Sequence, residues 1–416
     1  MLKIAFEAAK QANCAVAVWR LPNTEDINNK NIIVDFSAEI LPKKFSLEDN
    51  LGEKKAGFVV SPFKNKDFEQ TYFINADFFY SENSSENLPE NSSKNSSEKI
   101  KKTVFQSEKE ANFFKNLNHF SKKSNKKNDK NPVKLTLKPY NSDIFKELVK
   151  KAVLAIKNGD FLKVIASRQQ EVLFENQENS QENSQENATF DVMNAFDNLC
   201  KNYPNAFISL FFIPNVGSWM GASPEVLVSI DQKNVFHTMA LAGTQAHTQE
   251  KNLQSAVWTQ KEIEEQALVS RYIINCFKKI RLREFEEDGP KTVQAGNLLH
   301  LRTDFWVDME TVHFPHLASL MLGLLHPTSA VCGMPKEPAL TFIDANEAQQ
   351  RAFYCGFLGA INLQNQTNIF VNLRCMEIFE DKLVLYAGGG ITAHSDPEKE
   401  WNETVIKCQT ILNGIL

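Results

Sequence analysis

Long apolar stretches are absent from this chain of 416 residues. Nowhere do eighteen apolar residues follow one another, so we expect no transmembrane helix. The N-terminal sequence MLKIAFEAAKQANCAVAVWRLP indicates a short helix and a strand, and it lacks the sustained apolar core of a signal peptide. These absences predict a cytoplasmic protein with no membrane partner.

Paired cysteines and an excess of positive charge are also missing. The seven cysteines are scattered without a CxxC motif, which fits a reducing compartment better than a disulfide framework or a zinc site. The formal net charge of −5 and the pI near 6.0 argue against nucleic acid as the main partner, because no basic stripe interleaved with aromatics occurs. The hydrophobic content of 42% is ample for a large core.

Two polar, repetitive segments divide the chain. Residues 81–132 are rich in Ser, Asn, Glu and Lys and too poor in apolar residues to offset the entropy of ordering, although 105–120 indicates a helix within them. Residues 175–188 repeat a QENS unit and predict a long loop. We interpret both as solvated insertions between a β-rich N-terminal part, 1–80, and a denser region, 133–416.

The denser region indicates an α+β protein. Consecutive β-rich runs joined by short turns imply antiparallel sheet, and helices grouped between them imply a layered body. The expected helices are 142–158, 190–199 and 254–279, and the expected strands include 163–167, 207–213, 218–221, 226–230, 235–240, 369–378 and 382–387.

The sequence YAGGGITAHSDPEKEWNETVIK, residues 386–407, is the most informative stretch. A short strand, 383–386, is expected to break into a triple-glycine loop whose N–H groups can approach an anion. A capping residue and a proline then predict the start of a helix at 395–397. On this helix Glu400, Glu403 and Lys407 share one face.

A second carboxylate pair stands in the sequence KEIEEQ. Glu262 and Glu265 are three residues apart on the expected helix 254–279, as Glu400 and Glu403 are on the C-terminal one. Such a pair alone is most often a solvated helix face. Beside a glycine-rich anion loop, however, two facing pairs would suit a hard divalent cation such as Mg²⁺.

Eight motifs in order resemble the chorismate-utilising enzymes: isochorismate synthase, salicylate synthase, anthranilate synthase component I and aminodeoxychorismate synthase. The resemblance covers about 143–416, and it implies a single large domain of two large antiparallel sheets packed face to face with helices outside. It also implies chorismate as substrate and Mg²⁺ as cofactor. The motifs are FLKVIASR, MGASPEVLVSI, ALAGT, KEIEEQ, LLHPTSAVCGMPKEPA, RAFYCGFLGAIN, VNLRCMEI and YAGGGITAHSDPEKEWNETVIK.

The resemblance implies an acid and a base. Forming isochorismate adds water at C2 of the ring while the C4 hydroxyl leaves. Lys163 stands where isochorismate and salicylate synthases carry their general base, and it must be partly neutral to act. Glu225 matches the general acid, which requires a desolvated pocket to stay protonated. His300 resembles the histidine that contacts the departing hydroxyl, whereas His326 is expected to be structural.

Chorismate is a dianion, so its site should combine a guanidinium with backbone donors. The resemblance places one carboxylate on Tyr354, Arg374 and the N–H groups of Gly388, Gly389 and Gly390. It places the other on the backbone at Gly243 and Thr244 and on a metal held by Glu265 and Glu403. Glu262 and Glu400 are then expected to hold metal-bound waters, and Lys407 to neutralise the cluster.

Two positions favour isochorismate as the released product. Aminodeoxychorismate synthases carry a nucleophilic lysine where this chain has Ala242, and Ala330 stands where salicylate and anthranilate enzymes have threonine. We therefore predict Mg²⁺-dependent isomerisation of chorismate to isochorismate, for menaquinone or siderophore synthesis, by a monomer without a glutaminase subunit. The alternatives are a salicylate synthase and a catalytically silent protein that binds chorismate or a partner.

Overall fold

The structure is a computed structural model, and it describes residues 1–22, 29–48, 50–82, 107–123, 133–175, 190–246, 253, 255–295 and 298–416. Most of the predicted segments 81–132 and 175–188 lies outside the described residues, so their boundaries stay predictions. Helix α3 (Glu108–Lys123) belongs to the first segment and confirms the helix expected there. In the described part of the chain, no helix is long and apolar enough to cross a membrane.

The larger of two antiparallel sheets has the strand order β14-β7-β18-β17-β9-β8-β1-β2-β5, and β6 also pairs with β7. Strands β7 and β18 form its longest pairing, from Val164 opposite Ile391 to Leu173 opposite Lys382. The strands of this sheet are β1 (Ala15–Arg20), β2 (Lys30–Asp35), β5 (Phe78–Ser81), β6 (Lys134–Leu137), β7 (Lys163–Glu175), β8 (Phe207–Ile213), β9 (Gly217–Ser223), β14 (Gly333–Met334), β17 (Cys375–Ile378) and β18 (Lys382–Ile391).

The second sheet has the order β12-β13-β11-β10-β16-β15-β3-β4. It brings the C-terminal part of the chain beside the N-terminal part, because β15 pairs with β3. Its strands are β3 (Gly57–Ser61), β4 (Tyr72–Asn75), β10 (Val226–Ile230), β11 (Val235–Ala246), β12 (Glu286–Ala295), β13 (Leu298–Asp308), β15 (Phe357–Leu363) and β16 (Gln366–Val371).

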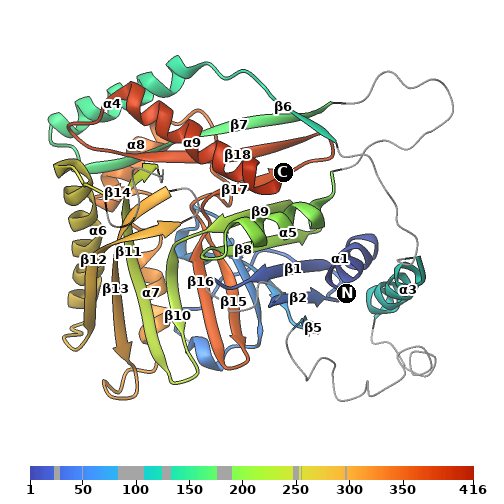
Figure 1. The fold of residues 1–416 in the computed structure, drawn as a ribbon. Helices are drawn as coiled ribbons and strands as arrows, with labels where there is room; N and C mark the ends of the chain where they lie inside the picture. The colour runs from blue at the N-terminus through green and yellow to red at the C-terminus, as the bar shows by residue number, and fades with distance from the viewer. Residues whose placement is uncertain are drawn as a thin grey trace.

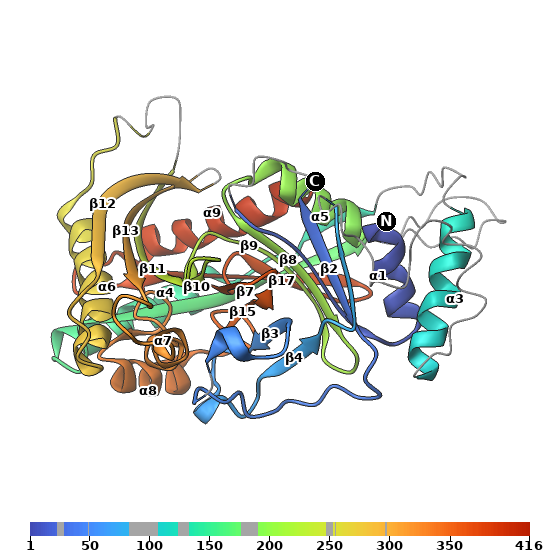
Figure 2. The same ribbon diagram turned by 90° about the horizontal axis from the view of Figure 1, so that it is seen from below.

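The helices lie around the two sheets (Figure 1). Helices α4 and α9 pack on each other and on β18, whereas α6 packs on β11 and β13. Figure 2 shows α1 and α3 side by side at the opposite end of the molecule from α6. The helices are α1 (Leu2–Gln11), α3, α4 (Ser142–Lys157), α5 (Val192–Asn202), α6 (Gln260–Lys279), α7 (Leu317–Leu325), α8 (Lys336–Asn346) and α9 (Pro397–Ile415), with short 3₁₀ turns at Leu51–Glu53 and Lys66–Phe68.

Side chains that alternate along the strands build the core between the sheets. In β1, Trp19 belongs to the apolar cluster between the sheets, while Val18 belongs to a second cluster that includes residues of α1, α5 and α9. Phe207 of the larger sheet stacks on Phe370 of the second, with ring centroids 4.1 Å apart. The predicted α+β fold, with two antiparallel sheets face to face and helices outside, is confirmed.

Several predicted boundaries are wrong in detail. The glycines 388–390 do not form a loop, because they continue β18 and pair with Ser167, Ala166 and Ile165 of β7. The expected strand 369–378 is interrupted at Arg374, whose φ of 48° breaks the extended backbone between β16 and β17. Helix α6 begins six residues later than expected, at Gln260, where Thr259 and Glu262 form a capping box.

Candidate active site

A cavity at the junction of the two sheets collects most of the predicted site residues. Strands β7, β11, β13 and β18 and helices α6 and α9 all contribute to its wall. The predicted residues that line it are Glu225, Gly243, Thr244, Glu265, His300, Ala330, Tyr354, Arg374, Gly388, Gly389, Gly390, Glu403 and Lys407, and Ala242 lines it as well. Residues as far apart in the sequence as Glu225 and Lys407 therefore share one site.

Lys163 begins β7 and is fully buried, with 0% of its side chain exposed. Its Nζ lies 2.9 Å from Oε1 of Glu265, which reaches it from α6. Burial alone would raise the pKa of Glu265, but the charges of Lys163, Lys261 and Lys407 outweigh it, so that pKa lies below the usual value. Lys163 is thus enclosed by protein, with the Glu265 carboxylate in direct contact with its amine.

Glu225 occupies the desolvated position that a general acid requires. It follows the turn after β9, and only 3% of the residue is exposed. Burial raises the pKa of the Glu225 carboxyl to about 8, although the charge of Lys163 and a hydrogen bond from Thr328 act in the opposite direction. The Thr328 hydroxyl donates to Oε1 at 3.5 Å. Glu225 is therefore largely protonated at neutral pH.

His300 and Arg374 form a pair that the sequence did not predict. A bulge in β11 at Gly243 and Thr244 places two residues opposite His300 of β13, and the Gly243 carbonyl accepts a hydrogen bond from His300 Nδ1 at 2.8 Å. Arg374 donates to the other ring nitrogen, Nε2, at 2.5 Å. Burial and the charge of Arg374 lower the pKa of His300 well below its usual range, so the imidazole is neutral.

Three glutamates beside the glycines are each held by a lysine. In addition to the pair of Glu265 with Lys163, Lys261 Nζ lies 2.5 Å from Glu400 Oε1. Lys407 Nζ lies 2.7 Å from Glu403 Oε1 and donates to the Gly388 carbonyl at the same distance. Three lysines thus pair with three carboxylates.

The absent side chains of Gly389 and Gly390 leave room for these carboxylates. A Cβ on Gly390 would lie 2.2 Å from Glu265 Oε1, and a Cβ on Gly389 would lie 3.0 Å from Glu400 Oε2 and 3.8 Å from Glu403 Oε1. The carboxylates of two helices thus converge on two adjacent residues of β18. Their oxygens are the donors that Mg²⁺ prefers, although no group of three or more His, Cys, Asp or Glu in the described residues forms a metal cluster by itself.

Glu262, the fourth predicted carboxylate, caps helix α6. Glu262 Oε2 accepts hydrogen bonds from the backbone N–H, at 2.7 Å, and the hydroxyl of Thr259, so it closes the N-terminus of α6. Its carboxylate does not line the cavity. Glu400 does not line it either, but its Oε2 lies directly behind Gly389.

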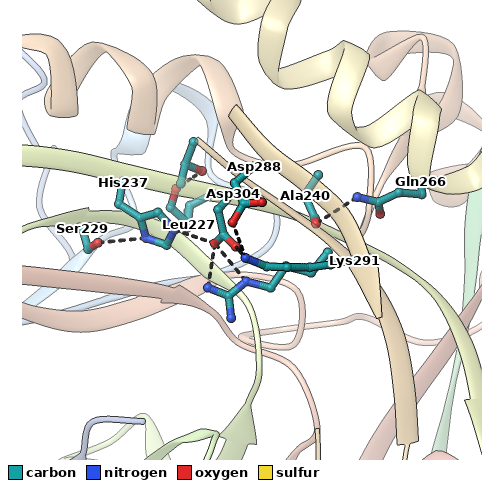
Figure 3. A network of polar contacts seen from close by, with 10 residues as sticks. Leu227, Ser229, His237, Ala240, Gln266, Asp288, Lys291 and Asp304 are labelled. Carbon is teal, nitrogen blue, oxygen red and sulfur yellow. Dashed lines mark hydrogen bonds and ion pairs between the residues drawn. The ribbon is translucent and has the colours of Figure 1, made fainter. Parts of the chain in front are cut away.

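Helix α6 is fixed by the residue that follows Glu265. The Gln266 amide donates to the Ala240 carbonyl of β11 at 3.2 Å and to the Thr303 hydroxyl of β13 at 3.0 Å. Figure 3 shows this contact beside a second network, in which the buried Asp304 lies 2.8 Å from His237 and 3.7 Å from Lys291. The Gln266 contacts hold α6 against the sheet and so hold Glu265 at the cavity, whereas the Asp304 network joins β11, β12 and β13.

Sequence reasoning missed several residues of the wall. Ile165 and Tyr386 line the cavity, as do Leu241, Val331, Cys355 and Leu373. The signal for two of them was the alternation of side chains along a strand, since Ile165 lies two residues after Lys163 and Tyr386 two before Gly388. His326, expected to be structural, is buried against Phe68 and Phe357 and does not line the cavity.

Substituting Gly390 tests the space between β18 and α6. Gly390→Ala is expected to lower activity with chorismate by at least tenfold, because the new methyl group would displace Glu265 and meet Lys163 Cε at 3.0 Å. Gly52→Ala is the matched control, since its Cβ would meet nothing closer than 3.6 Å. Equal activity of the two variants in steady-state assays would contradict the tight packing described here.

The comparisons with known proteins agree with this geometry. Residues 61–416 match the family of chorismate binding enzymes, and the chain belongs to that family. The chain is 31% identical over 199 residues to the vibriobactin-specific isochorismate synthase of Vibrio cholerae, and 27% identical over 261 residues to the isochorismate synthase MenF of Escherichia coli.

These alignments cover 46% and 62% of this chain and span 49% and 56% of the relatives' own lengths. The solved structure of MenF from Escherichia coli superposes with a TM-score of 0.70 at 18% identity, covering 99% of this chain and 91% of that one. At this identity the superposition shows a shared fold.

Proposed function

We propose that this chain is an isochorismate synthase, an isomerase that adds water at C2 of chorismate and expels the C4 hydroxyl. The observation that carries the proposal is a protonated carboxyl group, Glu225, on the cavity wall and a buried lysine, Lys163, which does not line the cavity itself but contacts Glu265 of its wall. Lys163 is fully enclosed, and burial raises the pKa of Glu225 to about 8. A base for the incoming water and an acid for the outgoing hydroxide are the two groups that this reaction requires.

The substrate is oriented by its two carboxylates. Arg374, which is buried at the cavity wall, binds the enolpyruvyl carboxylate together with Tyr354 and the backbone at Gly388–Gly390. Burial lowers the pKa of Arg374 to about 10, which still leaves the guanidinium charged at neutral pH. Neutral His300 accepts a hydrogen bond from Arg374 at Nε2, and its proposed role is to contact the departing hydroxyl.

The ring carboxylate would bind near Gly243 and Thr244, beside Glu265 and Glu403 of the cavity wall. Glu265 and Glu403 would hold Mg²⁺ there, with Glu400 behind Gly389 as a second carboxylate from α9. The ion supplies a charge that neutralises the substrate carboxylate and fixes its position. Glu262 is left out of this set because the cap of α6 engages it.

Two small residues favour release of isochorismate over further conversion. Ala330 and Ala242 both line the cavity, so no hydroxyl or amine from either position reaches the ring. A salicylate synthase is the second candidate, because it would use the same Lys163 and Glu225 before eliminating pyruvate. Isochorismate from this chain would enter menaquinone or siderophore synthesis, as the names of its relatives suggest.

Incubating the purified chain with chorismate and Mg²⁺ and separating the products tests the proposal. We expect isochorismate in equilibrium with chorismate, and no pyruvate. Salicylate with pyruvate would assign the second candidate, and anthranilate formed only with ammonia would assign the amination chemistry. Binding of chorismate without turnover would show a catalytically silent protein.

The affinity for Mg²⁺ should distinguish Glu265 and Glu403, the proposed metal ligands, from Glu262. Glu265→Gln and Glu403→Gln are each expected to weaken Mg²⁺ binding by at least tenfold in calorimetry with chorismate present, because each removes an anionic oxygen ligand. Glu262→Gln is the matched control on α6 and should leave both the affinity and the helix cap unchanged, because the glutamine oxygen can still accept the hydrogen bonds from Thr259. If Glu262→Gln lost as much Mg²⁺ affinity as the other two variants, Glu262 would also belong to the metal site.

A further inference from the structure

One edge of β7 lacks a neighbouring strand over part of its length. At its start β14 pairs with Lys163 and Val164, and near its end β6 pairs with residues 172–175. No strand of the described chain adjoins this edge between those two pairings. The backbone groups of the interval still need partners, because buried N–H and C=O groups without hydrogen bonds are costly.

Side chains from the segment between α8 and β15 fill this interval. Glu347 Oε1 accepts from the Ser167 N–H at 2.8 Å and from its hydroxyl at 3.0 Å. The Gln349 amide donates to the Ser167 carbonyl at 2.8 Å, and Arg351 donates to the Ile165 carbonyl at 2.8 Å. Three side chains at alternate positions thus bind the strand as a neighbouring strand would.

Glu347 and Arg351 also bind each other. Two hydrogen bonds of 2.8 and 2.6 Å join the guanidinium to the carboxylate, and the two side chains are only 3% and 2% exposed. The guanidinium lies over the Phe63 ring, 4.4 Å from its centroid. Although burial disfavours its charge, Glu347 keeps the pKa of Arg351 above its usual value. A buried pair with such geometry is rigid, because four of the five guanidinium N–H groups are directed at fixed acceptors.

Arg351 connects three parts of the cavity wall. Besides the Ile165 carbonyl, it binds the Val331 carbonyl at 2.7 Å, and its own carbonyl accepts from the Tyr354 N–H at 2.8 Å. Ile165, Val331 and Tyr354 all line the cavity. Ile165 lies two residues from Lys163, and Val331 directly follows Ala330. One side chain therefore sets the distance between the strand that carries the base and the turn opposite it.

We propose that Glu347 and Arg351 are positioning residues for the reaction, which replace a strand beside β7 and fix Lys163 relative to Ala330 and Tyr354. This inference rests on the proposed function for its kinetic consequences. Neither side chain lines the cavity, so neither is expected to contact the substrate. Their contribution should appear in kcat more than in KM, because a displacement of the base by about 1 Å can reduce the rate roughly 100-fold.

The test uses the paired variant Glu347→Gln with Arg351→Met, since removing one partner alone would leave a buried charge. We expect a folded protein that binds chorismate within threefold of wild type and has a kcat about 100-fold lower. The single variant Arg351→Lys should have a kcat between those of the paired variant and wild type. Lysine keeps the positive charge but cannot form the two parallel hydrogen bonds to Glu347. The control is Glu147→Gln with Lys150→Met, an exposed pair on α4, which should change neither constant.

A folded paired variant with kcat within threefold of wild type would overturn the proposal, as would a loss confined to KM. If the paired variant does not fold, Gln349→Leu removes one hydrogen bond to Ser167, and an unchanged kcat there would also overturn it. If wild type does not turn over chorismate, the proposed function fails, and amide hydrogen exchange decides the inference. Exchange at Ser167 should be faster in the paired variant, or in Gln349→Leu, than in the control, and unchanged exchange would contradict the proposal.

Discussion

Replacing Lys163 with methionine is expected to lower kcat with chorismate about a thousandfold, since general base catalysis typically contributes factors of a hundred to ten thousand. The side chain is fully buried beside Glu265, and methionine fills nearly the same volume without an amine. The proposed sites of the substrate carboxylates lie elsewhere, at Arg374 and at the glutamates, so binding should be largely retained. Stopped assays for isochorismate and calorimetry with chorismate and Mg²⁺ measure the two effects separately.

The exposed Lys150→Met on α4 is the control for the loss of a lysine, because it affects only the pair with Glu147. A Lys163→Met variant with a kcat within tenfold of wild type would remove this lysine from the mechanism. A variant that no longer binds chorismate would instead assign Lys163 to substrate binding.

Replacing Glu225 with glutamine is expected to lower kcat by a factor of a hundred or more, because the amide has the shape of the acid but no proton to give. In the wild type, burial raises the pKa of Glu225 to about 8, so kcat/KM should fall as the pH rises above about 8. A kcat/KM that stays constant to pH 10, or a glutamine variant with normal turnover, would contradict the assignment of Glu225 as the acid.

Stability provides a control on Glu225 that does not depend on activity. Its pKa is about 8 in the folded protein against 4.5 for the exposed group, so between these values the folded chain holds one more proton than the unfolded chain. Glu225 therefore makes the free energy of unfolding fall with rising pH across this window, by roughly 1.4 kcal/mol per pH unit at most. Denaturation experiments from pH 5 to 8 measure this effect. The free energy of unfolding should fall with rising pH more steeply in wild type than in Glu225→Gln, and the two slopes should differ by this amount.

The sequence was sufficient to predict the two-sheet fold, the start of α9 and most of the cavity wall. These features depend on local patterns, such as Asp396 and Pro397 at the helix start, and on motifs whose order along the chain is distinctive. The shared face of each helical carboxylate pair could also be predicted, because residues three apart lie on one face of a helix independently of the rest of the fold.

Contacts between distant segments could not be predicted from the residues alone. The glycines 388–390 were expected in a loop, but pairing with β7 over ten residues keeps them in a strand, and tertiary pairing overrides the local preference of glycine. For Glu262 a local contact decides instead, because this residue, expected at the metal, accepts the hydrogen bond that caps α6. The contact of Arg374 with His300 joins residues 74 positions apart and has no local signal.

Turnover of chorismate in H₂¹⁸O tests the central claim most directly. The account predicts isochorismate that carries one ¹⁸O atom, at C2, because the entering oxygen comes from water that Lys163 deprotonates while the C4 hydroxyl leaves with the proton of Glu225. Isochorismate without the label would mean that the hydroxyl moves within the substrate. Such a result would contradict the roles of both residues.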